Sequence, residues 1–169
     1  MKIYFAGPWF CASQNEREER LKAKLRSLGF EVHSPKENSN ITGSIMDASF
    51  RHKVFESNIH NIDDCDIIFG VTDGKKCLSI EPDQLGKETQ AVDTGTMVEC
   101  GYAYSLRCIR KDSPIIIYYA ETLGDKPFNL MLQESADIVI TDFNDLDNLP
   151  KYIEDAKKGI RKVHNGKTE

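Results

Sequence analysis

The segment Ala91–Ser105, AVDTGTMVECGYAYS, combines carboxylates with small residues at helical spacing. On a helix, Glu99 has Gly95 four residues before it and Ala103 four residues after it, so both neighbours leave an opening. Asp93 can cap the start of this helix, and the positive end of the helix dipole favours an ionised Glu99. An ionised glutamate beside an opening can act as a nucleophile or a base. The structural alternative makes Asp93 a plain cap and Glu99 an exposed helix residue.

A second segment, Tyr4–Phe10, has the sequence YFAGPWF and combines a glycine with aromatic rings. Gly7 and Pro8 end an apolar run, and Trp9 and Phe10 follow directly. Two adjacent rings can stack on a purine or a pyrimidine, or they can simply cover the end of a sheet. The segment lacks the GxGxxG pattern of a dinucleotide-binding turn.

Amide side chains occur at two further places. Asn129 lies in KPFNLM (126–131), where it can recognise a hydroxyl group or a base edge, or serve as a helix N-cap. Asn58, His60 and Asn61 lie on the helix expected before the third strand, and one of them can reach the same crevice.

Metal or disulfide chemistry is not indicated. The histidines lack ligand spacing, and the five cysteines form no CxxC pair, so we expect reduced thiols, no metal and no cofactor. Cys100 faces another side of the helix from Glu99 and is expected to pack. The net charge of −5 argues against a nucleic-acid polymer as partner.

Alternating strands and helices must position these groups. Apolar runs at residues 2–7, 30–35, 65–71, 114–120 and 136–142 predict five strands. Helices are predicted at 14–29, 50–63, 91–105, 130–135 and 148–163, with a polar functional loop at 36–49 and a long excursion at 72–92. Such alternation predicts an α/β fold with a parallel sheet, whose ligands lie at the carboxyl ends of the strands.

The chain of 169 residues fits one domain, predicted at residues 1–160 with a disordered tail at 161–169. Its apolar content of 40% and charged content of 29% are typical of a globular protein. The sequence shows neither a signal peptide nor a membrane span, so we expect a cytoplasmic protein with a small ligand and no membrane partner.

Three motifs together resemble the nucleoside 2-deoxyribosyltransferase family. They are IYFAGPWF, the pattern DxGTxxExGxA that begins at Asp93, and KPFNLM, and the similarity runs in order over residues 2–140. The resemblance implies a flavodoxin-like three-layer sandwich with a five-stranded parallel sheet, in agreement with the pattern of strands and helices.

The resemblance also implies a reaction, the exchange of the base of a 2'-deoxyribonucleoside for a free purine or pyrimidine. Glu99 matches the nucleophile, which forms a covalent deoxyribosyl-enzyme. Asp93 matches the carboxylate that holds the base and helps to move its proton. Tyr4 matches a residue that positions the nucleophile, and Trp9 and Phe10 match an aromatic wall near the base.

Other matching positions are expected to bind substrate, namely Gly7, Gly95 and Asn58. Asn129 and Met131 match residues that a neighbouring subunit inserts into the site, which implies a homo-oligomer. The family needs no cofactor and works in nucleotide salvage.

Some features depart from the family pattern and leave alternatives open. Asn58 stands where some members have an aspartate, the chain extends past the final helix, and the insertion Gly74–Ala91 borders the crevice. A nucleoside or nucleotide N-glycosidase would use the same Glu99 with water as acceptor. Lys36, Ser39 and Ser44 are basic or hydroxyl residues of the polar loop that can bind the phosphate of a nucleotide substrate. A non-catalytic nucleotide-binding domain is a second alternative. Base preference, tolerance of ribose and oligomer size stay open.

Overall fold

The computed structural model describes residues 1–37, 41–73, 75–78, 88–110, 112–124 and 128–164. Its main sheet has five parallel strands in the order β2-β1-β3-β6-β7. Their bounds are β1 Lys2–Ala6, β2 Glu31–His33, β3 Ile67–Val71, β6 Ile115–Tyr119 and β7 Ile138–Ile140. All five predicted strands are therefore present. Among the described residues, no helix has the length and apolar character needed to cross a bilayer.

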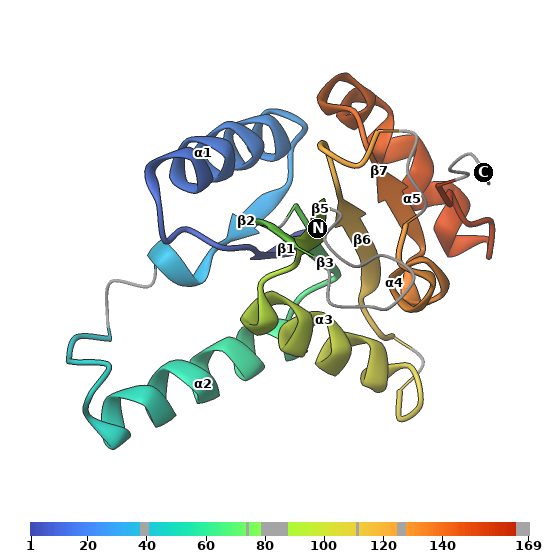
Figure 1. The fold of residues 1–169 in the computed structure, drawn as a ribbon. Helices are drawn as coiled ribbons and strands as arrows, with labels where there is room; N and C mark the ends of the chain where they lie inside the picture. The colour runs from blue at the N-terminus through green and yellow to red at the C-terminus, as the bar shows by residue number, and fades with distance from the viewer. Residues whose placement is uncertain (38–40, 74, 79–87, 111, 125–127, 165–169) are drawn as a thin grey trace.

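Helices cover both faces of this sheet, as Figure 1 shows. They are α1 Ala12–Ser27, α2 Ala48–Asp63, α3 Thr94–Leu106, α4 Leu130–Ser135 and α5 Leu149–Lys157. The side chains of α1 and α5 pack in one core with Phe5 and Phe69, whereas α2, α3 and α4 contribute to a second core around Tyr4 and Ile68. The predicted flavodoxin-like three-layer sandwich is confirmed.

A glycine in the central strand β3 lets the site helix α3 lie close to the sheet. A Cβ atom at Gly70 would lie 2.7 Å from the Sγ of Cys100, so a larger residue would displace α3. Cys100 is almost fully buried against the sheet, as predicted for a packing cysteine. The same helix carries Glu99 on another face, so this contact helps to set the depth of that carboxylate.

The excursion between β3 and α3 contains a hairpin that the sequence pattern did not predict. β4 Lys75–Leu78 pairs antiparallel with β5 Glu88–Ala91. Gly74 and residues 79–87 lie outside the described residues, as do Ser39 and Lys126. The influence of the insertion on substrate choice therefore stays a prediction.

The C-terminal helix is shorter than predicted. After the 3-10 helix η2 (Phe143–Asn148), α5 ends at Lys157, because Gly159 adopts a left-handed conformation with φ of 80°. The chain then returns to the sheet, where the backbone of Lys162 pairs with β7 on either side of Ile138. Residues 161–164, which we expected in a disordered tail, are thus joined to the domain, and residues 165–169 lie outside the described residues.

Candidate active site

Side chains of two elements, β1 and α2, hold the carboxylate of Glu99, which α3 carries. Tyr4 of β1 donates a hydrogen bond from its hydroxyl to Oε1 of Glu99 at 2.8 Å. Asn58 of α2 donates from Nδ2 to the same oxygen at 3.1 Å. Both donors bind Oε1, so Oε2 is the oxygen that neither of them occupies. The structure brings together three residues that sequence analysis assigned to the site.

The ring of Tyr4 is fixed deep inside the protein. Tyr4 is fully buried, and its ring stacks on His33 of β2 with centroids 5.9 Å apart and an interplanar angle of 27°. Burial and the charge of Glu99 raise the pKa of Tyr4 well above its usual value. The hydroxyl therefore keeps its proton and acts as a donor to the carboxylate.

Burial is the largest influence on the pKa of Glu99. It raises the pKa of Glu99 to about 7, and the charge of Asp93 raises it as well. The hydrogen bonds from Tyr4 and Asn58 lower the pKa but do not cancel the effect of burial. Our expectation of an ionised glutamate, which rested on its place in the helix, is corrected here, since burial favours the neutral carboxyl group.

A cavity of about 400 Å³ opens beside Glu99. Gly95 and Glu99 line it from α3, as predicted from their spacing. Ala103, the other small neighbour, is instead fully buried in the core under α3. The opening therefore extends from Glu99 toward the N-terminus of α3 only.

Apart from Asn58, the opposite wall of this cavity consists of residues that sequence analysis did not select. It contains apolar side chains of the segment before α2 and of α2 itself, together with one guanidinium: Ile45, Phe50, Arg51, Val54, Phe55 and Ile59. Part of the predicted functional loop, residues 48 and 49, is the first turn of α2, which Asp47 caps by accepting a hydrogen bond from the backbone of Ser49. The helical spacing of Phe50, Val54 and Phe55 was the available signal.

Asp93 both caps α3 and contributes charge to the site. Its Oδ2 accepts hydrogen bonds from the backbone nitrogen of Thr96 at 2.8 Å and from the hydroxyl of Thr96 at 3.0 Å. The predicted cap is thus present. Because its charge also raises the pKa of Glu99, Asp93 is electrostatically coupled to that carboxylate. Gly95 leaves space here, since a Cβ atom at that position would lie 3.1 Å from Oδ2 of Asp93.

The residues after β1 have two different environments. Gly7 is buried, and a Cβ atom there would lie 3.3 Å from Val71, so glycine allows the ends of β1 and β3 to approach. The rings of Trp9 and Phe10 contact each other with centroids 5.6 Å apart, but Phe10 is 71% exposed. Phe10 therefore does not cover the sheet, and contact of these rings with a base stays a prediction.

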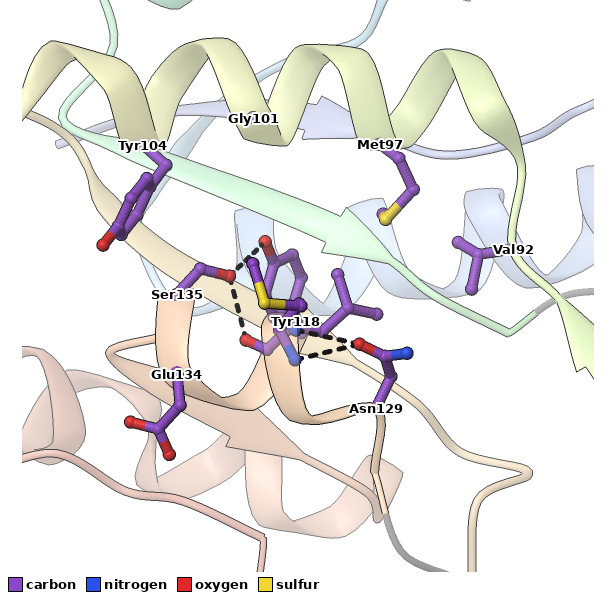
Figure 2. Close-up of a pocket in the computed structure, with 10 residues that line it drawn as sticks. Val92, Met97, Gly101, Tyr104, Tyr118, Asn129, Glu134 and Ser135 are labelled. Atoms are coloured by element: carbon purple, nitrogen blue, oxygen red, sulfur yellow. Dashed lines mark hydrogen bonds between the residues drawn. The ribbon is translucent and has the colours of Figure 1, made fainter.

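Asn129 and Met131 lie apart from the Glu99 cavity. They line a second cavity of about 540 Å³ between α3 and α4, which Figure 2 shows. Met97, Gly101 and Tyr104 line it from α3, and helical spacing puts these three on a different face from Gly95 and Glu99. Within one chain, these two residues therefore lie outside the crevice of Glu99, and their insertion into the site of a neighbouring subunit stays a prediction.

Asn129 also has the structural role that sequence analysis considered. Its Oδ1 accepts hydrogen bonds from the backbone nitrogens of Met131 at 3.0 Å and Leu132 at 3.3 Å, so it is the N-cap of α4. The cap fixes the side-chain oxygen of Asn129 on its own helix.

Asp73 is a buried carboxylate that sequence analysis missed. It follows β3, and its oxygens accept hydrogen bonds from the backbone nitrogens of Glu121 and Thr122 at 3.0 and 2.9 Å. Arg17 of α1 lies 3.4 Å from the same side chain. Asp73 thus fixes the loop after β6 to the end of β3. An aspartate directly after a buried strand was the signal that could have identified it.

The described residues include no cluster of metal ligands around Glu99. In the portion of the chain that the structure describes, no three His, Cys, Asp or Glu side chains form a group suited to a metal ion. The chemistry that the arrangement can perform rests on one oriented carboxylate, a phenol, an amide and a second carboxylate.

Replacing Tyr4 by phenylalanine is expected to lower kcat/KM by about 10- to 100-fold, because the ring stays packed while Oε1 of Glu99 loses one donor. Steady-state kinetics and thermal unfolding measure the effect. The variant should unfold within a few degrees of the wild type. A kcat/KM equal to that of the wild type would show that the hydrogen bond from Tyr4 has no part in the reaction.

Comparisons with known proteins show the family and the fold of this chain. The chain matches the model of a family described as nucleoside 2-deoxyribosyltransferase over residues 3–149. A 2-deoxyribosyltransferase of the psychrotolerant bacterium Bacillus psychrosaccharolyticus is 28% identical and has a TM-score of 0.66, with 88% of this chain and 91% of that chain covered. A conserved protein of Enterococcus faecalis V583 shares the fold at 17% identity and a TM-score of 0.64, with 92% and 98% covered. A comparison with curated proteins found no match.

Proposed function

Because this chain belongs to the nucleoside 2-deoxyribosyltransferase family, a family of pentosyltransferase enzymes, we propose that it exchanges the base of a 2'-deoxyribonucleoside for a free purine or pyrimidine. The observation that carries the proposal is the carboxylate of Glu99, which Tyr4 and Asn58 hold at the edge of a cavity. Base exchange of this kind fits a role in nucleotide salvage in the cytoplasm.

The reaction proceeds in two displacements at the anomeric carbon C1'. In the first, Oε2 of Glu99 forms a bond to C1' while the bond from C1' to the base nitrogen breaks, and the electron pair leaves with the base. Asp93 passes a proton to the departing base in this step and accepts the proton that the incoming base loses in the next step. In the second, a nitrogen of the incoming base attacks C1', and the carboxylate of Glu99 is released. Both transition states resemble an oxocarbenium ion, which a nearby anion stabilises.

The geometry around Glu99 supports these roles. Tyr4 and Asn58 both donate to Oε1, which leaves Oε2 as the attacking oxygen. A pKa of about 7 means that the carboxylate is ionised in much of the population, yet it stays a reasonable leaving group for the second displacement. No cofactor is needed for either step.

We further propose a homo-oligomer in which Asn129 and Met131 reach the site of a neighbouring subunit. The position of their cavity, on another face of α3 from Glu99, supports this arrangement. Met131 is 71% exposed and therefore available for contact with a second chain. Phe55 and Val98, beside the Glu99 cavity, are also exposed apolar residues that another subunit could cover.

One observation favours a second candidate, a nucleotide N-glycosidase. Arg51 lines the same cavity as Glu99, and a guanidinium can bind the phosphate of a 5'-nucleotide. Its Nη1 donates to the backbone oxygen of Ile45 at 2.8 Å, and the other N–H groups of the guanidinium can donate to a ligand. Water would then replace the second base as acceptor.

A base-exchange assay separates these functions. The enzyme is mixed with a 2'-deoxyribonucleoside and a different free base, over purine and pyrimidine pairs, and the products are separated by chromatography. We expect a new nucleoside that contains the added base. Free deoxyribose, or deoxyribose phosphate from a nucleotide, would instead identify a glycosidase. Binding without any product would indicate a non-catalytic domain.

A further inference from the structure

The helix that carries Asn129 and Met131 is too short to hold its position alone. α4 has six residues, and an isolated helix of that length is not stable in water. Asn129 caps its N-terminus, and Ser135 in its last turn bonds Tyr118 of β6 at 3.1 Å (Figure 2). The C-terminal end of α4 also receives contacts from a side chain outside the sheet.

Arg161 makes those contacts. Its Nε donates to the backbone oxygen of Ala136 at 2.9 Å, and its Nη1 to the carboxylate of Glu134 at 3.2 Å. Its Nη2 donates to the backbone oxygen of Gln133. The last carbonyls of a helix have no partner within the helix. The planar fork of Arg161 binds one of them, that of Gln133, together with the carbonyl of Ala136, the residue that follows the helix.

The backbone on either side of Arg161 is itself anchored. Gly159 turns the chain away from α5, and Lys162 then bonds β7 through its backbone nitrogen and oxygen. The ammonium of Lys162 also lies 2.9 Å from the carboxylate of Asp145 in η2. The segment that carries Arg161 is therefore attached to the sheet, and the side chain of Arg161 links α4 to that segment.

We propose that Arg161 is a positioning residue for the reaction, one that fixes α4 and thereby sets where Asn129 and Met131 lie. The inference rests on the proposed function, because it assumes that these two residues contact substrate in a neighbouring subunit. Arg161 itself touches no substrate. The segment after the last helix, which departs from the family pattern, thus acquires a specific role in this chain.

The test compares Arg161→Ala and Arg161→Lys with the wild type and with Arg26→Ala. Arg26 is a matched control, because its Nη2 also binds a backbone oxygen, that of Val32, and a carboxylate, that of Glu37, on the other side of the sheet. The readouts are steady-state kinetics of base exchange, thermal unfolding, and hydrogen exchange of the backbone amides of residues 130–136. The Lys variant keeps a donor without the planar fork and provides a milder change.

We expect Arg161→Ala to raise KM for the deoxyribonucleoside about tenfold with kcat changed less than about threefold, as for loss of an interaction that binds substrate and transition state alike. Amide exchange across residues 130–136 should accelerate at least about tenfold, with Arg161→Lys intermediate and Arg26→Ala unchanged.

Wild-type KM and wild-type amide exchange in Arg161→Ala would overturn the proposal, and so would an equal effect in Arg26→Ala. If the wild type itself lacks base exchange, the proposed function fails. In that case, the amide exchange of residues 130–136 still decides whether Arg161 holds α4.

Discussion

Replacing Glu99 by glutamine is expected to lower kcat/KM for base exchange by on the order of 10⁴-fold or more, since the amide cannot form the covalent bond to C1'. The amide oxygen can still accept the hydrogen bonds that Tyr4 and Asn58 give to Oε1. The fold should therefore persist, and a single-turnover assay by chromatography can show whether any exchange remains.

The same variant has a predicted effect on stability that depends on pH. Burial raises the pKa of Glu99 from 4.5 to about 7, so the folded protein favours the neutral carboxyl group. This stabilising contribution is complete below pH 4.5 and is lost as the pH rises through about 7. At pH 8 the wild type carries a buried charge, and we expect Glu99→Gln to have the higher Tm.

A matched control for these experiments is Glu154→Gln. Glu154 is an exposed residue of α5 whose carboxylate forms an ion pair with Lys157 at 3.0 Å, and it lies far from Glu99 in the sequence. We expect wild-type activity and no gain in Tm at pH 8. Normal turnover by Glu99→Gln would remove Glu99 from the mechanism.

The acidic limb of the pH profile is the second large effect that we predict. Only the ionised Glu99 can attack C1', and the pKa of this residue in the free enzyme is about 7. The value of kcat/KM should therefore fall about tenfold for each pH unit below 7, which amounts to about 100-fold at pH 5. Measurements at low substrate concentration between pH 5 and 9 provide this profile, and stability at each pH is checked by preincubation.

Tyr4→Phe offers an internal check on the assignment of that limb. The hydrogen bond from Tyr4 lowers the pKa of Glu99, so its removal should move the acidic limb to higher pH. A limb that stays flat down to pH 5 in the wild type would mean that Glu99 is not the group that titrates. If the acidic limb stays at the same pH in Tyr4→Phe, the hydrogen bond from Tyr4 does not influence the pKa of the group that titrates.

Much of the fold could be predicted from the sequence because its strands are short apolar runs with clear boundaries. The closing helix was the main error. Its apolar pattern continues to Val163, yet Gly159 ends it, and the residues beyond bind β7 instead. A local pattern cannot show that a distant strand offers a better partner than another turn of helix.

Part of the site could also be predicted. Tyr4 and Glu99 were selected from motifs and Asn58 from its place on the helix before the third strand, and the structure joins them by hydrogen bonds. The protonation of Glu99 was not predictable, because it depends on burial by residues far away in the chain. The wall around Phe50 and the position of Asn129, in a cavity beside another face of α3, likewise follow from the packing of helices, which the sequence of a single helix does not specify.

The central claim is that Glu99 becomes covalently attached to the sugar. A 2'-deoxy-2'-fluoro nucleoside should react slowly, because fluorine disfavours the positive charge that develops at C1', so the intermediate accumulates. The enzyme is then denatured and digested, and mass spectrometry locates the added sugar. We predict a mass increase equal to one fluorinated deoxyribosyl group on Glu99, and none in Glu99→Gln. An increase on another residue, or none in a wild type that still turns over this substrate, would contradict the mechanism.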